Sequence, residues 1–227
     1  MIYFVSDLHG EYELFCSLLD KINFSDDDTM YICGDILEKG DGSLKLLNLI
    51  SSKKNFKCVL GNHDENFLKY YRAIMERSPT DFDIVLSSLR EFFFEDKELL
   101  TWDMVDFLEF LPLYIETEDF ICVHAGIPID ENGYLKNLDK VSKEEFLFDR
   151  RFKDSNVIHK SKKCVFYGHT VTDNGKIIAY KRPNTKGDNI KDFYKIHLDT
   201  GAWQNGILGC FCLEKCECVY INKNQAK

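Results

Sequence analysis

Residues 1–10, MIYFVSDLHG, contain the pattern that decides the fold. An apolar run over Ile2–Val5 stops abruptly at a polar cluster that includes Asp7 and His9. Four consecutive apolar residues followed by a polar cluster with a glycine are typical of a buried β-strand rather than a helix. The stretch therefore predicts a strand whose carboxyl end presents an aspartate and a histidine.

The same arrangement recurs along the chain, in four further apolar runs at Met30–Cys33, Lys57–Leu60, Phe120–Val123 and Cys164–Tyr167. Between the first three of the five runs, apolar side chains recur at helical spacing over Tyr12–Ile22 and Ser43–Ser51. Alternation of strand and helix with short connections predicts a βαβαβ unit in an α/β sandwich.

The segment from Glu65 to about Leu111 has helical spacing throughout, and includes the aromatic residues Phe92–Phe94 and Trp102. Helices that pack on the sheet are the favoured interpretation for most of its apolar side chains. No internal repeat or linker interrupts the chain. We therefore expect one domain over residues 1–227 with a helical insertion at about 65–111.

Each of the five predicted strands ends in a short polar cluster that contains glycine. In an open α/β sheet, ligands bind outside the carboxyl ends of the strands, so these clusters are expected to form one site. Any one cluster is weak evidence, but four of the six histidines of the chain fall in the five. The clusters are Ser6–Gly10, Gly34–Gly40, Gly61–Asp64, His124–Gly126 and Gly168–Thr170.

The side chains in these clusters are carboxylates, imidazoles and an amide, without a thiol. This mixture suits Mn, Fe, Zn or Ni rather than Ca or a structural zinc ion. There are more candidate ligands than one ion needs, and a carboxylate on the central strand can bridge two ions about 3.5–4 Å apart. The pattern predicts a two-metal site that activates water for hydrolysis.

The blocks SDLHG, GDILEKG, GNHD, VHAG and YGHT, in this order, resemble the signature of the calcineurin-like metallophosphoesterases. Within that family the chain is most similar to the phosphoprotein phosphatase branch, particularly compact bacterial and phage members such as the phage lambda protein phosphatase. The blocks span residues 6–170, and LDTG at Leu198–Gly201 resembles a further element of the bacterial members. The resemblance implies a sandwich of two mixed β-sheets flanked by helices.

The resemblance also implies roles for individual residues. Asp35 would bridge two divalent metal ions, for which Mn is favoured and Fe, Zn or Ni are alternatives. His63 would donate a proton to the leaving group, with Glu38 orienting its ring. The remaining metal ligands implied are Asp7 and His9 for the first ion, and Asn62, His124 and His169 for the second.

Two positions depart from the family pattern. Glu38 stands where the family usually has Asp, which keeps the charge but lengthens the side chain. Lys39 stands where the family has a phosphate-binding Arg, and a lysine offers a point charge instead of a bidentate fork. Arg150 falls where short bacterial members carry a second phosphate-binding Arg, with Arg151 as an alternative.

The favoured function is a dimetal serine/threonine, or tyrosine, protein phosphatase. The alternative is a symmetrical diadenosine tetraphosphate hydrolase, whose bacterial representatives share HAGI at His124–Ile127, GSL at Gly42–Leu44, and LDTG. A third and weaker interpretation is an inactive metal-binding interaction module. The expected substrate is thus a phosphoprotein, a phosphopeptide or a dinucleoside polyphosphate. Phe92–Phe94 or Trp102 could stack on an adenine, although buried packing is favoured.

Composition limits the remaining possibilities. The formal net charge of −9 disfavours a nucleic acid or an anionic membrane as a partner. Nine cysteines, an odd number, without a recognisable signal peptide predict reduced thiols in a cytoplasmic protein. Four of these cysteines lie at 210–218, where a β-hairpin turning at Glu214-Lys215 is favoured over a zinc site. His159 and His197 match no motif and are predicted to be structural or surface residues.

Overall fold

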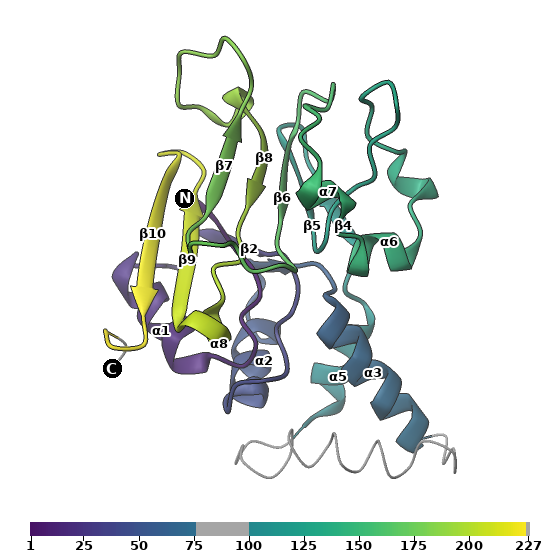
Figure 1. Cartoon of the computed structure of the whole chain (residues 1–227). Coiled ribbons are helices and arrows are strands. Elements are labelled where there is room, and N and C mark those ends of the chain that lie inside the picture. Colours follow the sequence, from purple (N-terminus) through teal and green to yellow (C-terminus); the bar gives the residue numbers. More distant parts are fainter. Residues whose placement is uncertain (76–99, 226–227) are drawn as a thin grey trace.

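The computed structural model describes residues 1–75 and 100–225, and two five-stranded mixed sheets form its centre (Figure 1). The first sheet has the strand order β10-β9-β1-β2-β3, and the second has the order β4-β5-β6-β8-β7. The strands of the first sheet are β1 (Ile2–Val5), β2 (Thr29–Ile32), β3 (Phe56–Cys58), β9 (Ile207–Cys212) and β10 (Glu217–Asn222). Those of the second are β4 (Tyr114–Glu116), β5 (Phe120–Val123), β6 (Cys164–Tyr167), β7 (Ile178–Lys181) and β8 (Phe193–His197).

Each sheet contains three neighbouring parallel strands. In the first sheet β1 pairs in parallel with β2, and β2 with β3, while β9 runs antiparallel to β1. In the second sheet β5, β6 and β8 are parallel, with β4 and β7 antiparallel at the edges. All five predicted strands form, with β2 and β3 each starting one residue earlier than predicted. The two mixed sheets confirm the expected α/β sandwich.

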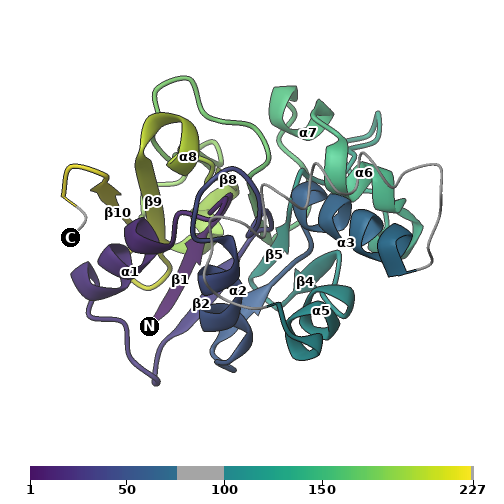
Figure 2. The same cartoon turned by 90° about the horizontal axis from the view of Figure 1, so that it is seen from below.

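Four helices cover the outer face of the first sheet. They are α1 (Tyr12–Lys21), α2 (Ser43–Ser51), α3 (Asn62–Met75) and α5 (Trp102–Glu109). Seen from below, α1, α2, α5 and α3 follow one another across this face (Figure 2). Their buried side chains, such as Phe15, Leu47, Phe67 and Leu108, share one hydrophobic cluster with the strand residue Val5.

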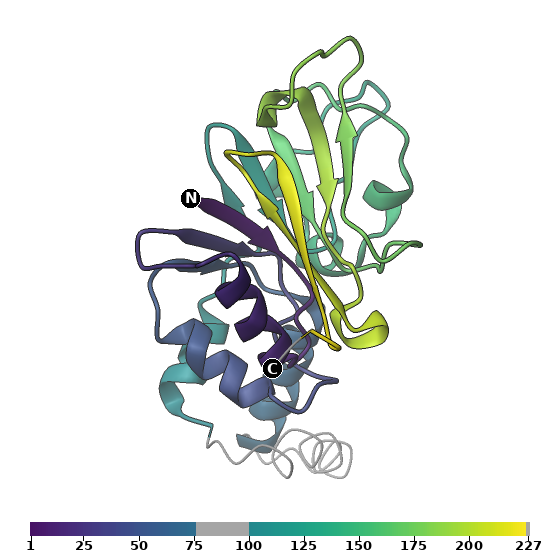
Figure 3. The same cartoon turned by 90° about the vertical axis from the view of Figure 1, so that its left-hand side faces the viewer.

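A second apolar layer fills the space between the two sheets, which Figure 3 shows stacked against each other. Phe4 of β1 stacks on Phe166 of β6 with 3.6 Å between ring centroids. Cys33, Cys122 and Cys164 are buried in the same layer as small apolar side chains. This layer fixes the two sheets face to face, so that the ends of their parallel strands meet.

The outer face of the second sheet is covered by α6 (Lys143–Phe148) and α7 (Arg151–Asp154), which bury Phe146 and Phe152. The side chain of Ser142 caps α6 in a capping box with Glu145. The remaining short elements are α8 (Ala202–Asn205) and the 3₁₀ turns η1 (Leu138–Lys140) and η2 (Ile190–Asp192).

The helical segment predicted at 65–111 is helical at both of its described ends. The first helix, α3, starts at Asn62, so the motif that follows β3 forms the first turn of this helix. Residues 76–99, with Phe92–Phe94, lie outside the described residues. The buried side chains of α3 and α5 belong to the cluster under the first sheet, and the single-domain organisation stays a prediction.

The expected burial of Trp102 is wrong, because its side chain is 66% exposed. Helix α5 buries Met104, Val105 and Leu108, whereas Trp102 is the first residue of the helix and is not among its buried residues. Its ring contacts Tyr71 edge-on at 6.4 Å.

The C-terminal hairpin forms as predicted, with β9 and β10 antiparallel across the turn at Glu214-Lys215. Cys210 and Cys212 are buried, whereas Cys218 is exposed. His159 and His197 are structural: each donates from Nε2 to a backbone carbonyl, of Tyr194 and Thr170 respectively. Within the described ranges, no helix has both the length and the hydropathy to cross a membrane.

Candidate dimetal centre

The ligand-bearing loops meet around Asp35, which follows β2, the neighbour of the central strand β1 in the first sheet. Asp35 is buried, and its two carboxylate oxygens face in different directions. Oδ2 lies 3.6 Å from Nε2 of His9, and Oδ1 lies 3.5 Å from Nε2 of His124. Asp35 is therefore shared by two groups of potential metal ligands, one on each side.

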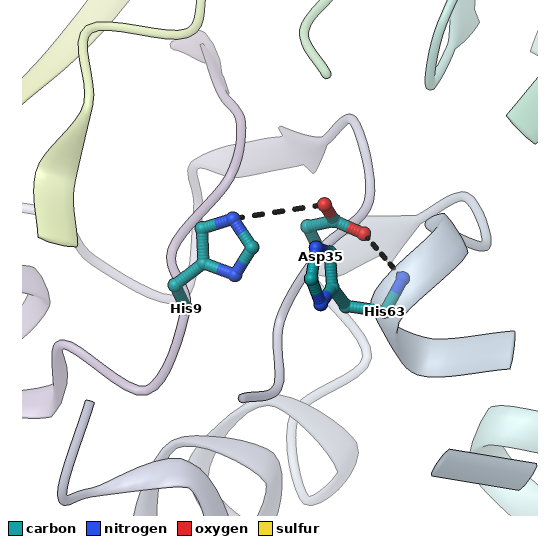
Figure 4. A group of neighbouring side chains, drawn as sticks. All are labelled: His9, Asp35 and His63. Carbon is teal, nitrogen blue, oxygen red and sulfur yellow. Dashed lines mark hydrogen bonds and ion pairs between the residues drawn. The ribbon is translucent and has the colours of Figure 1, made fainter. Parts of the chain in front are cut away.

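The first group consists of His9, Asp35 and His63 (Figure 4). The backbone N–H of His63 donates to Oδ1 of Asp35 at 2.9 Å, which fixes the start of α3 against the aspartate. Nδ1 of His9 donates to the carbonyl of Leu37 at 3.1 Å. This bond leaves the lone pair of Nε2 of His9 directed toward Asp35, as metal-binding histidines require.

The second group consists of Asp35, His124 and His169, joined by Asn62. Oδ1 of Asn62 lies 2.8 Å from Nε2 of His124 and 2.9 Å from Nδ1 of His169. The two ring nitrogens are 3.2 Å apart. The carbonyl of Cys33 accepts from Nδ1 of His124 at 2.8 Å, so the lone pair of Nε2 faces the group.

These spacings test whether the residues fit metal ions. Two donors that each lie about 2.0–2.1 Å from one ion, at about right angles, are about 3 Å apart. The 3.2 Å between the nitrogens of His124 and His169 meets this requirement. Carboxylate, amide and imidazole donors together suit first-row divalent ions. The described residues therefore fit two divalent cations that share Asp35.

The electrostatics of the site keep its imidazoles neutral and disfavour negative charge on its carboxylates when no cation is bound. Burial lowers the pKa of His9 to about 4 and that of His169 to about 3, so both imidazoles are neutral. Burial raises the pKa of Asp7 well above its usual value, and the neighbouring carboxylates of Asp199 and Asp35 add to this effect. A cluster of buried carboxylates with this mutual repulsion is stabilised by bound cations.

Asp7, expected to bind the first ion, lies outside both groups of potential ligands. Its carboxylate accepts from the backbone N–H of His169, at 3.1 Å to Oδ1 and 3.0 Å to Oδ2. The hydroxyl of Ser6 also donates to Oδ2. In the described structure Asp7 therefore ties the loop after β1 to the loop after β6.

Asp199 is a site residue to which the sequence analysis assigned no role. It follows β8, is buried, and lines the same cavity as Asp35 and His169. Burial raises its pKa to about 7, although the backbone N–H of Gly201 donates to it at 2.9 Å. The LDTG block, quoted only as a resemblance, was the signal that could have found it.

Asp64 is a second residue that the sequence analysis left without a role. It is fully buried in the first turn of α3 and accepts three backbone N–H groups. Ile36 and Leu37 donate to Oδ1, each at 3.0 Å, and Gly61 donates to Oδ2 at 3.1 Å. Asp64 thus holds the loop after β2 against the loop after β3.

Glycine is required where the loops approach most closely. A Cβ atom on Gly61 would lie 2.1 Å from the backbone nitrogen of Asp35. A Cβ atom on Gly168 would lie 2.0 Å from Oδ2 of Asp7. Both distances are far shorter than a van der Waals contact, so any larger residue would displace a site carboxylate.

Residues with strained backbone conformations cluster at this site. A non-glycine residue with a left-handed backbone is uncommon and costs about 1–2 kcal/mol. Of the nine such residues described, six belong to the ligand-bearing loops. Such clustering is typical of functional sites. The six are Asp7, His9, Asp35, Glu38, Lys39 and His169.

His63 and Glu38 lie together as the resemblance implied. Nδ1 of His63 contacts a carboxylate oxygen of Glu38, and His63 lines the cavity. Burial opposes the charged form of His63, but the hydrogen bond with Glu38 and the charges of Asp35 and Glu38 outweigh it and raise the pKa of His63. The longer side chain of Glu38 therefore reaches the ring.

Two positively charged side chains, of Lys39 and Arg150, line the cavity at the dimetal centre, whose volume is ≈ 170 Å³. Nζ of Lys39 is 3.1 Å from Nε2 of His9, and Arg150 lines the cavity near His169, whose pKa its charge helps to lower. Arg151 instead pairs with Asp149 and has a side chain that is 74% exposed. The structure thus places Arg150, and not Arg151, at the cavity.

The chain belongs to the calcineurin-like phosphoesterase family, whose model matches residues 1–198. The fold and the two ligand groups agree with this assignment. The chain therefore has the fold of a phosphoesterase family and residues that could hold two divalent ions.

Among curated proteins, the chain is 36% identical over 132 residues to a symmetrical bis(5'-nucleosyl)-tetraphosphatase of Aggregatibacter actinomycetemcomitans, covering 56% of this chain and 45% of that protein. It is 37% identical over 130 residues to the enzyme of the same name from Buchnera aphidicola subsp. Schizaphis graminum, covering 56% and 44%. The aligned part is thus less than half the length of each of these relatives.

Solved structures show the same fold. A putative diadenosine tetraphosphatase superposes with a TM-score of 0.69 at 18% identity, over 97% of this chain and 92% of that one. A serine/threonine phosphatase from Saccharomyces cerevisiae superposes with a TM-score of 0.51 at 15% identity, over 97% and 78%. At these identities the likeness concerns the fold alone.

Proposed function

We propose that the protein hydrolyses dinucleoside polyphosphates with two divalent cations, most suitably Mn, at the groups that share Asp35. The geometry that supports hydrolysis is the sharing of this one buried carboxylate by two sets of donors. The choice of substrate rests on the 36–38% identity to symmetrical bis(5'-nucleosyl)-tetraphosphatases. These relatives favour the alternative weighed from the sequence over the protein phosphatase.

His9, Asp35, Asn62, His124 and His169 would hold the two cations. When bound, such cations stabilise charge on phosphate oxygens and lower the pKa of water. Water attacks a central phosphorus atom in line with the leaving oxygen. One P–O bond forms and one breaks, so a dinucleoside tetraphosphate and water give two nucleoside diphosphates.

His63 supplies the proton for the leaving phosphate oxygen. Its Nδ1 is held by Glu38, so Nε2 is the nitrogen available to the cavity. Lys39 and Arg150 line the same cavity and neutralise the phosphate oxygens that do not react. Asp7 joins the loops that carry His9 and His169, and in the proposed holoenzyme it remains a candidate ligand for the first ion.

The test compares diadenosine tetraphosphate with a phosphoserine peptide at equal concentration and saturating Mn. Anion-exchange chromatography should show ADP as the single nucleotide product, with kcat/KM at least tenfold above that for the peptide. A faster reaction with the peptide would overturn the proposal in favour of a protein phosphatase. Bound metal without hydrolysis of any phosphoester would support an interaction module.

A matched variant separates this site from a contaminating activity. His63→Asn keeps a polar side chain at the start of α3 but removes the proton donor. It should lower kcat for diadenosine tetraphosphate by about 10²–10⁴-fold, the usual contribution of a general acid. An unchanged kcat would show that the reaction occurs elsewhere.

A further inference from the structure

A second cavity adjoins the candidate dimetal centre and has no role in the proposed chemistry. Its volume is ≈ 250 Å³, and Lys39 and Trp203 line both this cavity and the catalytic one. Trp203 is 47% exposed, which is unusual for so large an apolar side chain. The two cavities thus meet at one aromatic ring and one ammonium group.

The walls of this second cavity suit a neutral aromatic ligand. Three lysines and three acidic residues line it, so it carries no net formal charge and does not favour a further phosphate. Two aromatic rings, of Trp203 and Tyr12, are also part of its lining. The charged residues are Glu11, Glu13, Asp41, Lys39, Lys45 and Lys223.

Four of these charged groups contact one another or the rings. Lys223 pairs with Glu11 at 2.7 Å. Nζ of Lys39 lies 5.8 Å from the ring centroid of Trp203, and Nζ of Lys45 lies 5.9 Å from that of Tyr12. A flat ligand with hydrogen-bonding edges can stack on such a ring while its edge meets lysine and carboxylate groups.

The backbone fixes Trp203 relative to the catalytic cavity. Trp203 lies on the single turn of α8, which follows β8 in the chain and lies beside the lower end of β9 in Figure 1. Glycines with left-handed backbones, Gly201 at φ 75° and Gly206 at φ 63°, bound this turn. The amide of Asn205 donates to the carbonyl of Thr200 at 3.0 Å, and Ala202 is buried beneath.

The same loop carries Asp199, whose carboxylate accepts from the N–H of Gly201 at 2.9 Å. Only three residues separate Asp199, at the catalytic cavity, from Trp203 at the boundary. The backbone of this turn therefore places the side chain of Trp203 beside the candidate site of hydrolysis.

We infer that Trp203 stacks on a nucleobase of the substrate, and that the second cavity is a nucleobase subsite beside the dimetal centre. This inference rests on the proposed function, because the phosphates attached to that nucleoside would occupy the catalytic cavity. Trp203 is then a residue that determines specificity for nucleotides over other phosphoesters. It takes no part in bond breaking.

The activity test compares diadenosine tetraphosphate with inorganic tripolyphosphate, which has phosphates but no base. Stacking on an aromatic side chain contributes about 1–3 kcal/mol per base. Trp203→Ala should therefore lower the ratio of kcat/KM for the two substrates by about tenfold or more, mainly through KM. Trp203→Phe should restore part of the ratio. Phe110→Ala is the matched control, because Phe110 is an exposed aromatic side chain at the end of α5 that lines neither cavity, and it should leave the ratio as it is.

A binding test keeps the inference separate from the proposed function. In Trp102→Phe, Trp203 is the remaining tryptophan, since the chain has two. ADP added with Mn should quench its fluorescence, and tripolyphosphate should not. Quenching by ADP without hydrolysis of diadenosine tetraphosphate would support the nucleobase subsite and overturn the proposal that dinucleoside polyphosphates are the substrates. Hydrolysis with no quenching, or an unchanged ratio in Trp203→Ala, would overturn the subsite and leave the substrate standing.

Discussion

The two ligand groups around Asp35 differ in how tightly they are packed. In the second group, Asn62, His124 and His169 lie within 2.8–3.2 Å of one another. His124 is fully buried there. In the first group the nearest approach of His9 to Asp35 is 3.6 Å, and the side chain of His63 is 23% exposed. The distances to Asp35 are alike, 3.5 Å from His124 and 3.6 Å from His9, so the difference lies in the additional close donors of the second group. We expect the second group to hold its ion more tightly than the first.

Asp35→Asn should have the largest effect, because both groups share this carboxylate. Removing its charge weakens the binding of both ions at once. We expect kcat/KM to fall by about a thousandfold or more, which corresponds to about 4 kcal/mol of lost transition-state stabilisation. Steady-state rates with excess Mn check this. Rates near those of the unmodified protein in metal-replete samples would show that the two groups do not form one site.

Two alanine variants measure the difference between the groups directly. His9→Ala should still retain about one ion per chain after gel filtration with a chelator, because the second group is intact. His169→Ala should lose the tightly held ion and retain at most the weaker one. Metal content by plasma mass spectrometry distinguishes them. Equal retention in both variants would contradict the difference in packing.

His159 lies outside both groups and tests acid stability independently of metal binding. Burial lowers its pKa to about 4 in the folded state, against about 6.5 when unfolded. Between these values the unfolded chain binds a proton that the folded chain does not, so the free energy of unfolding falls as pH decreases from 6.5 to 4.

His159→Gln removes this contribution while its amide can still donate to the carbonyl of Tyr194. Urea unfolding at pH 7 and pH 4.5, with equal metal, measures how much the free energy of unfolding falls between the two pH values. This fall should be smaller by about 2 kcal/mol in the variant than in the unmodified protein. The same loss in both proteins would show that another group controls acid stability.

The smallest effect is expected at Lys39, on the open side of the first group. Lys39→Arg introduces a bidentate fork for phosphate and should lower KM for diadenosine tetraphosphate by about threefold at similar kcat. Arg150→Lys is the converse change and should raise KM. An increase in KM for Lys39→Arg would mean that the fork does not fit beside Trp203.

Much of the site could be predicted because strand ends are visible in the sequence. An apolar run such as Ile2–Val5 or Cys164–Tyr167 marks a buried strand, and the polar residues after it must lie at the edge of the sheet. Most of the ligands predicted in this way lie in the two groups around Asp35, and Asp7 lies close enough for its carboxylate to repel that of Asp35. The orientation of Asp7 depends on its hydrogen bonds to His169 and Ser6, which no sequence pattern specifies.

Asp199 and Trp203 were not predicted from the sequence, because the strand before them is not a continuous apolar run. Strand β8 is fully buried, yet it contains Lys195 and His197. Nζ of Lys195 is satisfied by three backbone carbonyls, of Phe152, Lys153 and Ser155. Burial of charged groups depends on such tertiary partners, so this strand end could not be recognised by hydropathy.

The pairing of Tyr3 with Cys212 has a consequence for biosynthesis. Strand β1 lies at the centre of the first sheet, yet one of its two neighbours, β9, is synthesised some two hundred residues later. Contacts so distant in sequence form slowly. On the ribosome, one edge of β1 has no partner strand until β9 has been synthesised. Asp199 is also synthesised late. We therefore expect the metal ions to be acquired after translation of the chain, and not while its first half folds.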